Sequence, residues 1–219
     1  MKRLGILGGT FDPIHMGHLR TAVEIGQELN LEKVYLVPSA SPPHKTIEPV
    51  TSFQHRLTMA RLALGGSSFL EVLDLEGKRP GLSYSIETLK EIHNTFSPDP
   101  ELFFILGMDA FREIMTWKEY QHLFDYSHFV IIQRPGFQPD KIEPLLTNIG
   151  LDIRQTKRPD VFMTRSGKTL TFMVATRMDI SSTHIRELIR NSKSIRFLVP
   201  DPVRIYIMEK GLYKSHATS

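Results

Sequence analysis

Short apolar runs that alternate with helix-like repeats constrain the fold of this 219-residue chain more than any other feature. Most of the runs are continuously apolar, which is typical of parallel strands covered on both faces. They lie at residues 4–7, 34–37, 69–75, 102–106, 129–132 and 170–174. Between most of them, apolar residues recur every three or four positions, the pattern of an amphipathic helix. The sequence therefore predicts an α/β fold, an open parallel sheet with helices on both faces.

The expected helices lie at residues 19–29, 51–64, 85–93, 182–189 and 202–209. Thr51, followed three residues later by Gln54, is a capping-box pattern at the start of the second of them. Residues 137–180 fit the alternation less well, because they are polar and contain a single strand-like run. Since no linker divides the chain, we expect one domain over residues 1–219, with a helical C-terminal part over 180–219.

Composition excludes several classes of protein. There are no cysteines, which excludes disulfides, Cys-ligated zinc, iron–sulfur clusters and a cysteine nucleophile. A net charge of +3 suits a small anionic ligand and does not make nucleic acid the default partner. No apolar run reaches the roughly 18–20 residues of a membrane helix. Asp12 and Pro13 interrupt the apolar start, which argues against a signal peptide. We expect a cytoplasmic protein with no membrane partner.

The most informative segment runs from Gly8 to His18, after the first expected strand and before the first expected helix. Gly8 and Gly9 allow backbone to approach a ligand closely. A helix start offers unpaired N–H groups and the positive end of the helix dipole, which together bind phosphate. The segment matches neither the dinucleotide fingerprint nor the P-loop. It therefore predicts a phosphate site of another kind.

Cationic side chains are disfavoured in the first turn of a helix, because they meet the positive end of the dipole. His15 and His18 nevertheless lie three residues apart at this helix start, and Arg20 follows. A bound anion would explain all three. The alternative is a capping turn with partly buried histidines. A metal site is the weaker interpretation, because the pattern lacks a carboxylate and a third ligand.

A second helix start has the same character. Ser182 and Thr183 are of the residue types that cap helices. Arg186 follows and again places a cation early in a helix. Two helix starts with the same unfavourable charge indicate a polyphosphate ligand, with Arg186 as its clamp.

Three other positions have a functional and a structural interpretation. Trp117, the only tryptophan, could stack on a planar heterocycle or pack in the core. Asp109, at a strand end, could accept hydrogen bonds from a ribose or cap the next helix. His44 and Lys45 follow two prolines after the second strand, in what is otherwise an exposed loop.

Taken together, these residues resemble the nucleotidyltransferase superfamily with the H-x-G-H signature. Residues 15–18 supply that signature, and residues 180–186 resemble the second one, I-S-S-T-x-I-R. The similarity extends to the bacterial nicotinate-nucleotide adenylyltransferase family through shorter matches at residues 42–45, 83–85, 107–109, 117 and 134–136. That family usually has Ser-Tyr-Thr where this chain has Ser83-Tyr84-Ser85. Because a hydroxyl is retained, we expect the contact to survive.

The resemblance implies a Rossmann-like sheet of the nucleotidyltransferase type. It implies transfer of AMP from ATP to nicotinate mononucleotide in NAD biosynthesis, giving deamido-NAD and pyrophosphate by direct in-line attack without a covalent intermediate. Mg²⁺ would arrive with ATP. The amide mononucleotide and phosphopantetheine are alternative substrates. A non-catalytic nucleotide sensor and a basic nucleic-acid-binding module are alternatives from other classes. The oligomeric state stays open.

The resemblance also implies roles for individual residues. The catalytic residues would be His15, His18 and Arg186. ATP would be held by Gly8, Gly9, Thr10, Phe11, His15, His18, Gly107, Asp109, Ile180, Ser182, Thr183 and Arg186. The mononucleotide would be held by His44, Lys45, Tyr84, Ser85, Trp117 and Arg134. The C-terminal part would complete the ATP site.

Overall fold

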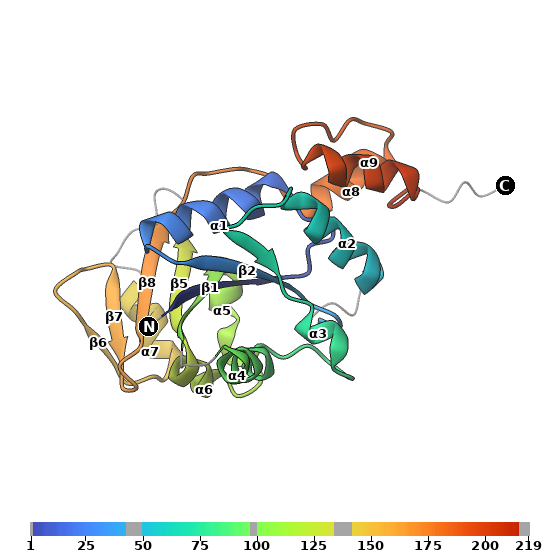
Figure 1. Cartoon of the computed structure of the whole chain (residues 1–219). Coiled ribbons are helices and arrows are strands. Elements are labelled where there is room, and N and C mark those ends of the chain that lie inside the picture. The colour runs from blue at the N-terminus through green and yellow to red at the C-terminus, as the bar shows by residue number, and fades with distance from the viewer. Residues whose placement is uncertain (1, 43–49, 97–99, 134–141, 215–219) are drawn as a thin grey trace.

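A computed structural model describes residues 2–42, 50–96, 100–133 and 142–214. In this part of the chain one sheet has the strand order β3-β2-β1-β4-β5-β8-β7-β6 (Figure 1). The strands are β1 (Arg3–Gly9), β2 (Lys33–Pro38), β3 (Leu70–Val72), β4 (Glu101–Gly107), β5 (His128–Gln133), β6 (Ile153–Gln155), β7 (Val161–Thr164) and β8 (Thr169–Val174). β1 lies between β2 and β4, so the strand order reverses there, which is where open α/β sheets bind ligands.

Neighbouring strands are parallel across β3, β2, β1, β4, β5 and β8. The last two strands of the sheet, β7 and β6, are antiparallel to their neighbours. The predicted parallel sheet is therefore confirmed for its main part. The expectation of a single strand within residues 137–180 was wrong, because β6 and β7 also lie there. Both are short, and β6 is largely exposed. Such strands lack the apolar run that marks a buried strand.

Helices cover both faces of the sheet, as predicted. One face carries α1 (Met16–Glu28), α2 (Phe53–Ala63), α8 (Ser182–Arg190) and α9 (Asp201–Glu209). The other carries α3 (Leu75–Lys78), α4 (Ser85–Thr95), α5 (Met108–Arg112), η1 (Ile114–Thr116), α6 (Tyr120–Tyr126) and α7 (Ile142–Ile149). The side chains of the central strands alternate between two separate apolar cores. In β4, Phe103 and Ile105 face the first set of helices, and Phe104 and Leu106 face the second.

Two local expectations need correction. The cap of α2 is Ser52, whose hydroxyl accepts from the His55 N–H, and not Thr51. The expected strand over 69–75 is shorter, because β3 ends at Val72 and α3 follows. No helix in the described ranges has both the length and the apolar character needed to span a bilayer.

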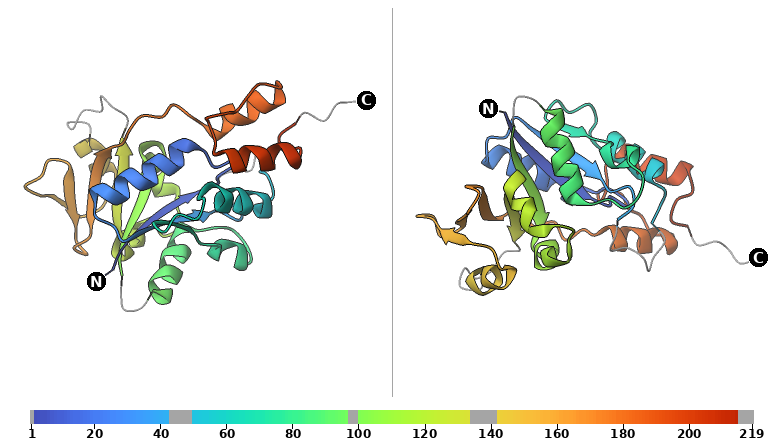
Figure 2. Two further views of the ribbon diagram at one scale, coloured as in Figure 1. Left: turned by 45° about the horizontal axis from the view of Figure 1, so that its top comes forward. Right: turned by 90° about the horizontal axis from the view of Figure 1, so that it is seen from below.

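The C-terminal helices lie against the segment that opens α1. The Met16 N–H donates to the Leu198 carbonyl at 2.9 Å, and α9 packs along α2. Figure 2 shows these helices and the β6–β7 hairpin at opposite ends of the molecule. The fold therefore brings residues 180–213 to the carboxyl ends of β1 and β4.

Candidate active site

Two adjoining cavities open at the carboxyl edge of the sheet. The first, of about 360 Å³, lies between the start of α1, the ends of β4 and β5, and residues 175–181. The second, of about 580 Å³, lies between residues 8–10, the start of α4 and residues 116–118. His18 and Gly107 line both cavities. A group bound in one cavity would therefore meet a group bound in the other beside His18.

The two histidines of the first signature are held together. His15 is the N-cap of α1, and His18 is its third residue. Their rings stack with centroids 3.6 Å apart. The His15 N–H donates to the His18 Nδ1 at 3.2 Å. Because Nδ1 accepts this bond, the proton of a neutral His18 ring resides on Nε2, which makes Nε2 the donor of the ring.

His15 differs from the expectation of a cation at the helix start. Its side chain is 6% exposed, and burial lowers its pKa from 6.5 to about 4. It is therefore neutral at pH 7, and its position at the positive end of the α1 dipole carries no charge penalty. Its buried Nδ1 has no hydrogen-bond partner among the described residues. Arg20 does not enter either cavity, and its Nε lies 3.0 Å from Glu24 Oε2.

The second helix start contacts the first. The Ser181 hydroxyl caps α8 by accepting from the His184 N–H at 3.1 Å. The Ser182 hydroxyl donates to the Pro13 carbonyl at 2.9 Å. Arg186 donates from Nη1 to the Asp12 carbonyl, also at 2.9 Å. The predicted convergence of two helix starts is therefore present, although Arg186 lies in the second turn of α8 rather than the first.

The second cavity contains the aromatic residues expected to meet the mononucleotide. Trp117 is partly buried, its ring meets Phe104 edge-on at 6.2 Å, and it lines the cavity. It therefore contributes to both the core and the cavity wall. Tyr84 caps α4 and Ser85 begins it, so the first N–H groups of that helix face the same space. The Lys118 Nζ lies 4.6 Å above the Tyr84 ring.

The residues expected to bind ATP do not all line one cavity. His15, His18, Gly107 and Ile180 line the first cavity. The loop residues Gly8, Gly9 and Thr10 line the second. Five expected residues line neither cavity: Phe11, Asp109, Ser182, Thr183 and Arg186. The Asp109 side chain is exposed and lies 4.0 Å from Arg112, in the first turn of α5 rather than at its cap. His44, Lys45 and Arg134 fall outside the described residues.

Arg56 was not among the residues singled out from the sequence, and the structure buries it. The side chain is 1% exposed and donates four hydrogen bonds to backbone carbonyls. The acceptors lie in three loops, one of which, residues 10–15 between β1 and α1, we name the phosphate loop after the site predicted there. The distances are 2.7 Å to Thr10, 2.6 Å to Ser39, 3.1 Å to Ala40 and 2.7 Å to Thr51. Arg56 therefore fixes the loops that wall the second cavity. Its place on the same helix face as Met59 and Ala60 was the available signal.

Glu76 was also missed. It lines the second cavity, is 8% exposed, and accepts a hydrogen bond at Oε1 from the Thr88 hydroxyl at 2.7 Å. Its Oε2 has no partner in the described part of the chain. Nothing local in the sequence marks this glutamate as buried.

A resident metal centre has no donor set in the residues that the structure describes. No group of three or more histidine, aspartate or glutamate side chains there is placed to hold an ion. A metal entering with a substrate phosphate would not need such a group, because it keeps several waters.

Comparisons with known proteins agree with this geometry. A family model described as cytidylyltransferase-like matches residues 6–188. A probable nicotinate-nucleotide adenylyltransferase from Desulfatibacillum aliphaticivorans is 45% identical, over 96% of this chain and 99% of its own length. One of the same name from Geotalea daltonii is 44% identical, over 96% and 98%.

Solved structures share the fold. The nicotinic acid mononucleotide adenylyltransferase of Plasmodium falciparum, complexed with NaAD, aligns with a TM-score of 0.72 at 22% identity, over 97% of this chain and 98% of that one. The same enzyme complexed with APC aligns with a TM-score of 0.69 at 23% identity and the same coverage. The family match and the close relatives together show that this chain belongs to the cytidylyltransferase-like family and, within it, to the nicotinate-nucleotide adenylyltransferases.

Proposed function

We propose that this protein transfers AMP from ATP to nicotinate mononucleotide, forming deamido-NAD and pyrophosphate in the biosynthesis of NAD. The observation that carries the proposal is the wall shared by the two cavities, in which His18 and Gly107 face both spaces. A dinucleotide-forming enzyme needs two nucleotide sites that meet where the new bond forms. The relatives at 44–45% identity bear the name of this activity over nearly their full length.

The chemistry requires little beyond alignment and charge stabilisation. The phosphate of the mononucleotide is already ionised at pH 7 and attacks the α-phosphorus of ATP in line, with no covalent intermediate. Pyrophosphate leaves, and negative charge grows on the oxygens around the reacting phosphorus. His18, at the junction, donates from Nε2 to one of these oxygens and stabilises the transition state. No general base is needed.

ATP occupies the first cavity, with its triphosphate directed toward the starts of α1 and α8. The unpaired N–H groups at both helix starts can donate hydrogen bonds to the phosphate oxygens. Arg186 and the hydroxyls of Ser182 and Thr183 hold the β- and γ-phosphates. These side chains already lie beside the phosphate loop through the bonds to Asp12 and Pro13. Thr10 and the two glycines before it lie toward the reacting centre.

Nicotinate mononucleotide occupies the second cavity. Its pyridine ring stacks on Trp117, and its carboxylate meets the first N–H groups of α4 near Ser85. His44, Lys45 and Arg134 hold its phosphate and ribose. Mg²⁺ bound to ATP would neutralise charge on the phosphates and would keep most of its water. We further propose that the protein works in the cytoplasm, and that residues 1–219 act as a single domain in which 180–219 complete the ATP site.

Pyrophosphate release from ATP tests the function. The purified protein is assayed with nicotinate mononucleotide, its amide and phosphopantetheine side by side. We expect the highest kcat/KM with the acid mononucleotide. A higher kcat/KM with the amide mononucleotide or phosphopantetheine would show that this acceptor is the preferred substrate instead. No turnover with any of the three acceptors would refute the enzyme function.

A further inference from the structure

The end of the chain returns to the phosphate loop. After α9, the Tyr213 hydroxyl donates to Asp12 Oδ1 at 2.6 Å, across 201 positions of sequence. Tyr213 has a φ of +64°, in the left-handed region that a non-glycine residue adopts at a cost. A residue near the end of a chain keeps such a conformation only when its surroundings hold it there. We propose that Tyr213 is a positioning residue for the AMP transfer proposed above, acting on His18 through Asp12.

Asp12 joins three distant parts of the fold. It is 4% exposed. Its Oδ2 accepts from the Thr51 N–H at 3.1 Å, just before α2, and its backbone carbonyl accepts from Arg186 of α8 at 2.9 Å. With Tyr213 on Oδ1, every oxygen of this residue has a donor. Because a buried carboxylate that loses a donor is costly, removing any one bond disturbs the position of the others.

The path from Asp12 to the reacting centre is short. Phe11, the preceding residue, has a φ of +51°. Its ring meets the His18 ring edge-on, with centroids 5.0 Å apart. The same ring lies so close to Gly9 that a Cβ there would be 2.9 Å from it. The backbone at Asp12 therefore sets the placement of Phe11, and Phe11 sets one side of His18.

Tyr213 keeps its proton under all relevant conditions. Burial and the neighbouring Asp12 carboxylate raise its pKa above the ordinary value, so the hydroxyl remains a donor. The groups that face it are Asp12, Thr51, Arg186 and the Met59 sulfur. Tyr213 does not line either cavity, so it acts through its neighbours and not by touching substrate.

The chain offers a matched control on the same C-terminal element. The Tyr206 hydroxyl lies 2.8 Å from His55 Nδ1 and joins α9 to α2. Like Tyr213, it ties the C-terminal part of the chain to the rest of the fold through a side-chain hydrogen bond, but its partner lies in α2 and not in the phosphate loop. Tyr206→Phe therefore reports the effect of loosening the C-terminal helix alone, whereas Tyr213→Phe adds the effect on Asp12.

The experiment compares kcat, KM for both substrates and the melting temperature in wild type, Tyr213→Phe and Tyr206→Phe. We expect Tyr213→Phe to lower kcat roughly tenfold with KM for nicotinate mononucleotide unchanged, because small displacements of a catalytic group act on the transition state. We expect Tyr206→Phe to keep kcat within about twofold. Its melting temperature should fall about as much as that of Tyr213→Phe, because each variant loses one hydrogen bond.

A double-mutant cycle makes the assignment specific. In an Asp12→Asn background, Tyr213→Phe should lower kcat by much less than in wild type, because the two residues act as one unit. Wild-type kcat in Tyr213→Phe, or an equal loss in Tyr206→Phe, or full additivity with Asp12→Asn would each overturn the inference. An inactive wild type would instead refute the proposed function on which the inference rests, and the inference with it.

Discussion

Two largely buried histidines at opposite edges of the sheet share the same pKa shift but differ in their hydrogen-bond partners. His15 lies at the carboxyl edge, and His128, the first residue of β5, lies at the amino edge. Burial lowers the pKa of each to about 4, so both are neutral at pH 7. Their partners differ, and we propose that His15 serves the reaction whereas His128 serves the structure.

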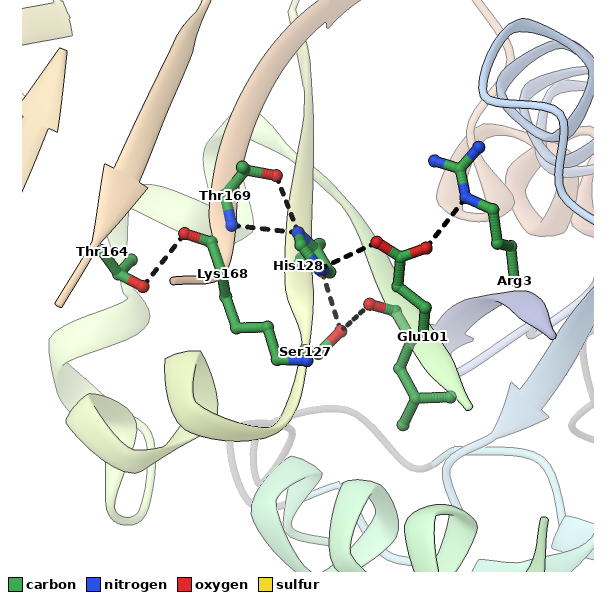
Figure 3. Close-up of polar contacts among 8 residues, drawn as sticks. Arg3, Glu101, Ser127, His128, Thr164, Lys168 and Thr169 are labelled. Atoms are coloured by element: carbon green, nitrogen blue, oxygen red, sulfur yellow. Dashed lines mark hydrogen bonds and ion pairs between the residues drawn. The ribbon is translucent and has the colours of Figure 1, made fainter. Parts of the chain in front are cut away.

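Both ring nitrogens of His128 have partners (Figure 3). Nδ1 accepts from the Thr169 N–H at 3.0 Å, and Nε2 lies 3.4 Å from Glu101 Oε1. Glu101 in turn accepts from Arg3 at 3.0 Å. The ring stacks on Phe103 with centroids 4.9 Å apart. This network joins β1, β4, β5 and β8 where these strands begin, and it faces no cavity described above.

His15 keeps a buried ring nitrogen without a partner among the described residues, and its ring rests on His18. A fold does not retain an unsatisfied polar atom without compensation. At the amino edge the protein itself supplies the partners, whereas at this edge we propose that the bound nucleotide supplies one. Substitutions at the two edges should therefore separate activity from stability.

The largest effect is expected at the junction of the cavities. His18→Ala should lower kcat by roughly 10²–10³, the scale of losing one transition-state donor. The melting temperature should change little, because the ring is only partly buried. Steady-state pyrophosphate release measures the first, and thermal unfolding the second. Near-normal turnover would remove His18 from the mechanism.

Trp117→Ala should act on one substrate only. Loss of stacking should raise KM for nicotinate mononucleotide about tenfold, the scale of one base–aromatic contact. KM for ATP should stay unchanged, since Trp117 does not line the first cavity. Both constants come from the same assay. An equal rise in KM for ATP, or none for the mononucleotide, would contradict the assignment of cavities to substrates.

His128→Leu should give the converse result. It leaves the Thr169 N–H and Glu101 Oε1 without their partner, which should lower the free energy of unfolding by about 1–3 kcal/mol. Turnover at a temperature where the variant is folded should match wild type. Urea unfolding and the pyrophosphate assay measure the two quantities. A large fall in kcat of the folded variant would show that the two edges are not independent.

The smallest effect is a pH dependence of stability. The pKa of each histidine is about 4 in the folded chain and has the ordinary value of 6.5 in the unfolded chain. As the pH falls, the unfolded chain therefore binds the proton at a higher pH than the folded chain does. The contribution of each neutral histidine to the free energy of unfolding is therefore fully present above pH 6.5 and is lost as the pH falls toward 4. His128→Leu should reduce the slope of unfolding free energy against pH in this window. An unchanged slope would show that His128 titrates normally.

Local patterns predicted the features that depend on neighbours in sequence. The apolar runs located β1, β2, β4, β5 and β8, and the residue types at 15–18 and 180–186 located both helix starts. The β6–β7 hairpin was missed because its strands are short and partly exposed.

The long-range polar contacts could not be predicted. Arg56 looks like any surface cation until three distant loops supply its acceptors. The contact of Tyr213 with Asp12 joins the two ends of the chain and has no periodicity. Sequence thus located the two helix starts of the site, and the tertiary fold determined what holds them together.

The proposed mechanism requires that the starts of α1 and α8 share one triphosphate. A crystal structure of the protein with a non-hydrolysable ATP analogue tests it most directly. We predict that the triphosphate lies between the two helix starts, with His18 Nε2 and the Arg186 guanidinium both within hydrogen-bond distance of its oxygens. A triphosphate that contacts only one of these helices, or that lies in the cavity lined by Trp117, would contradict the account.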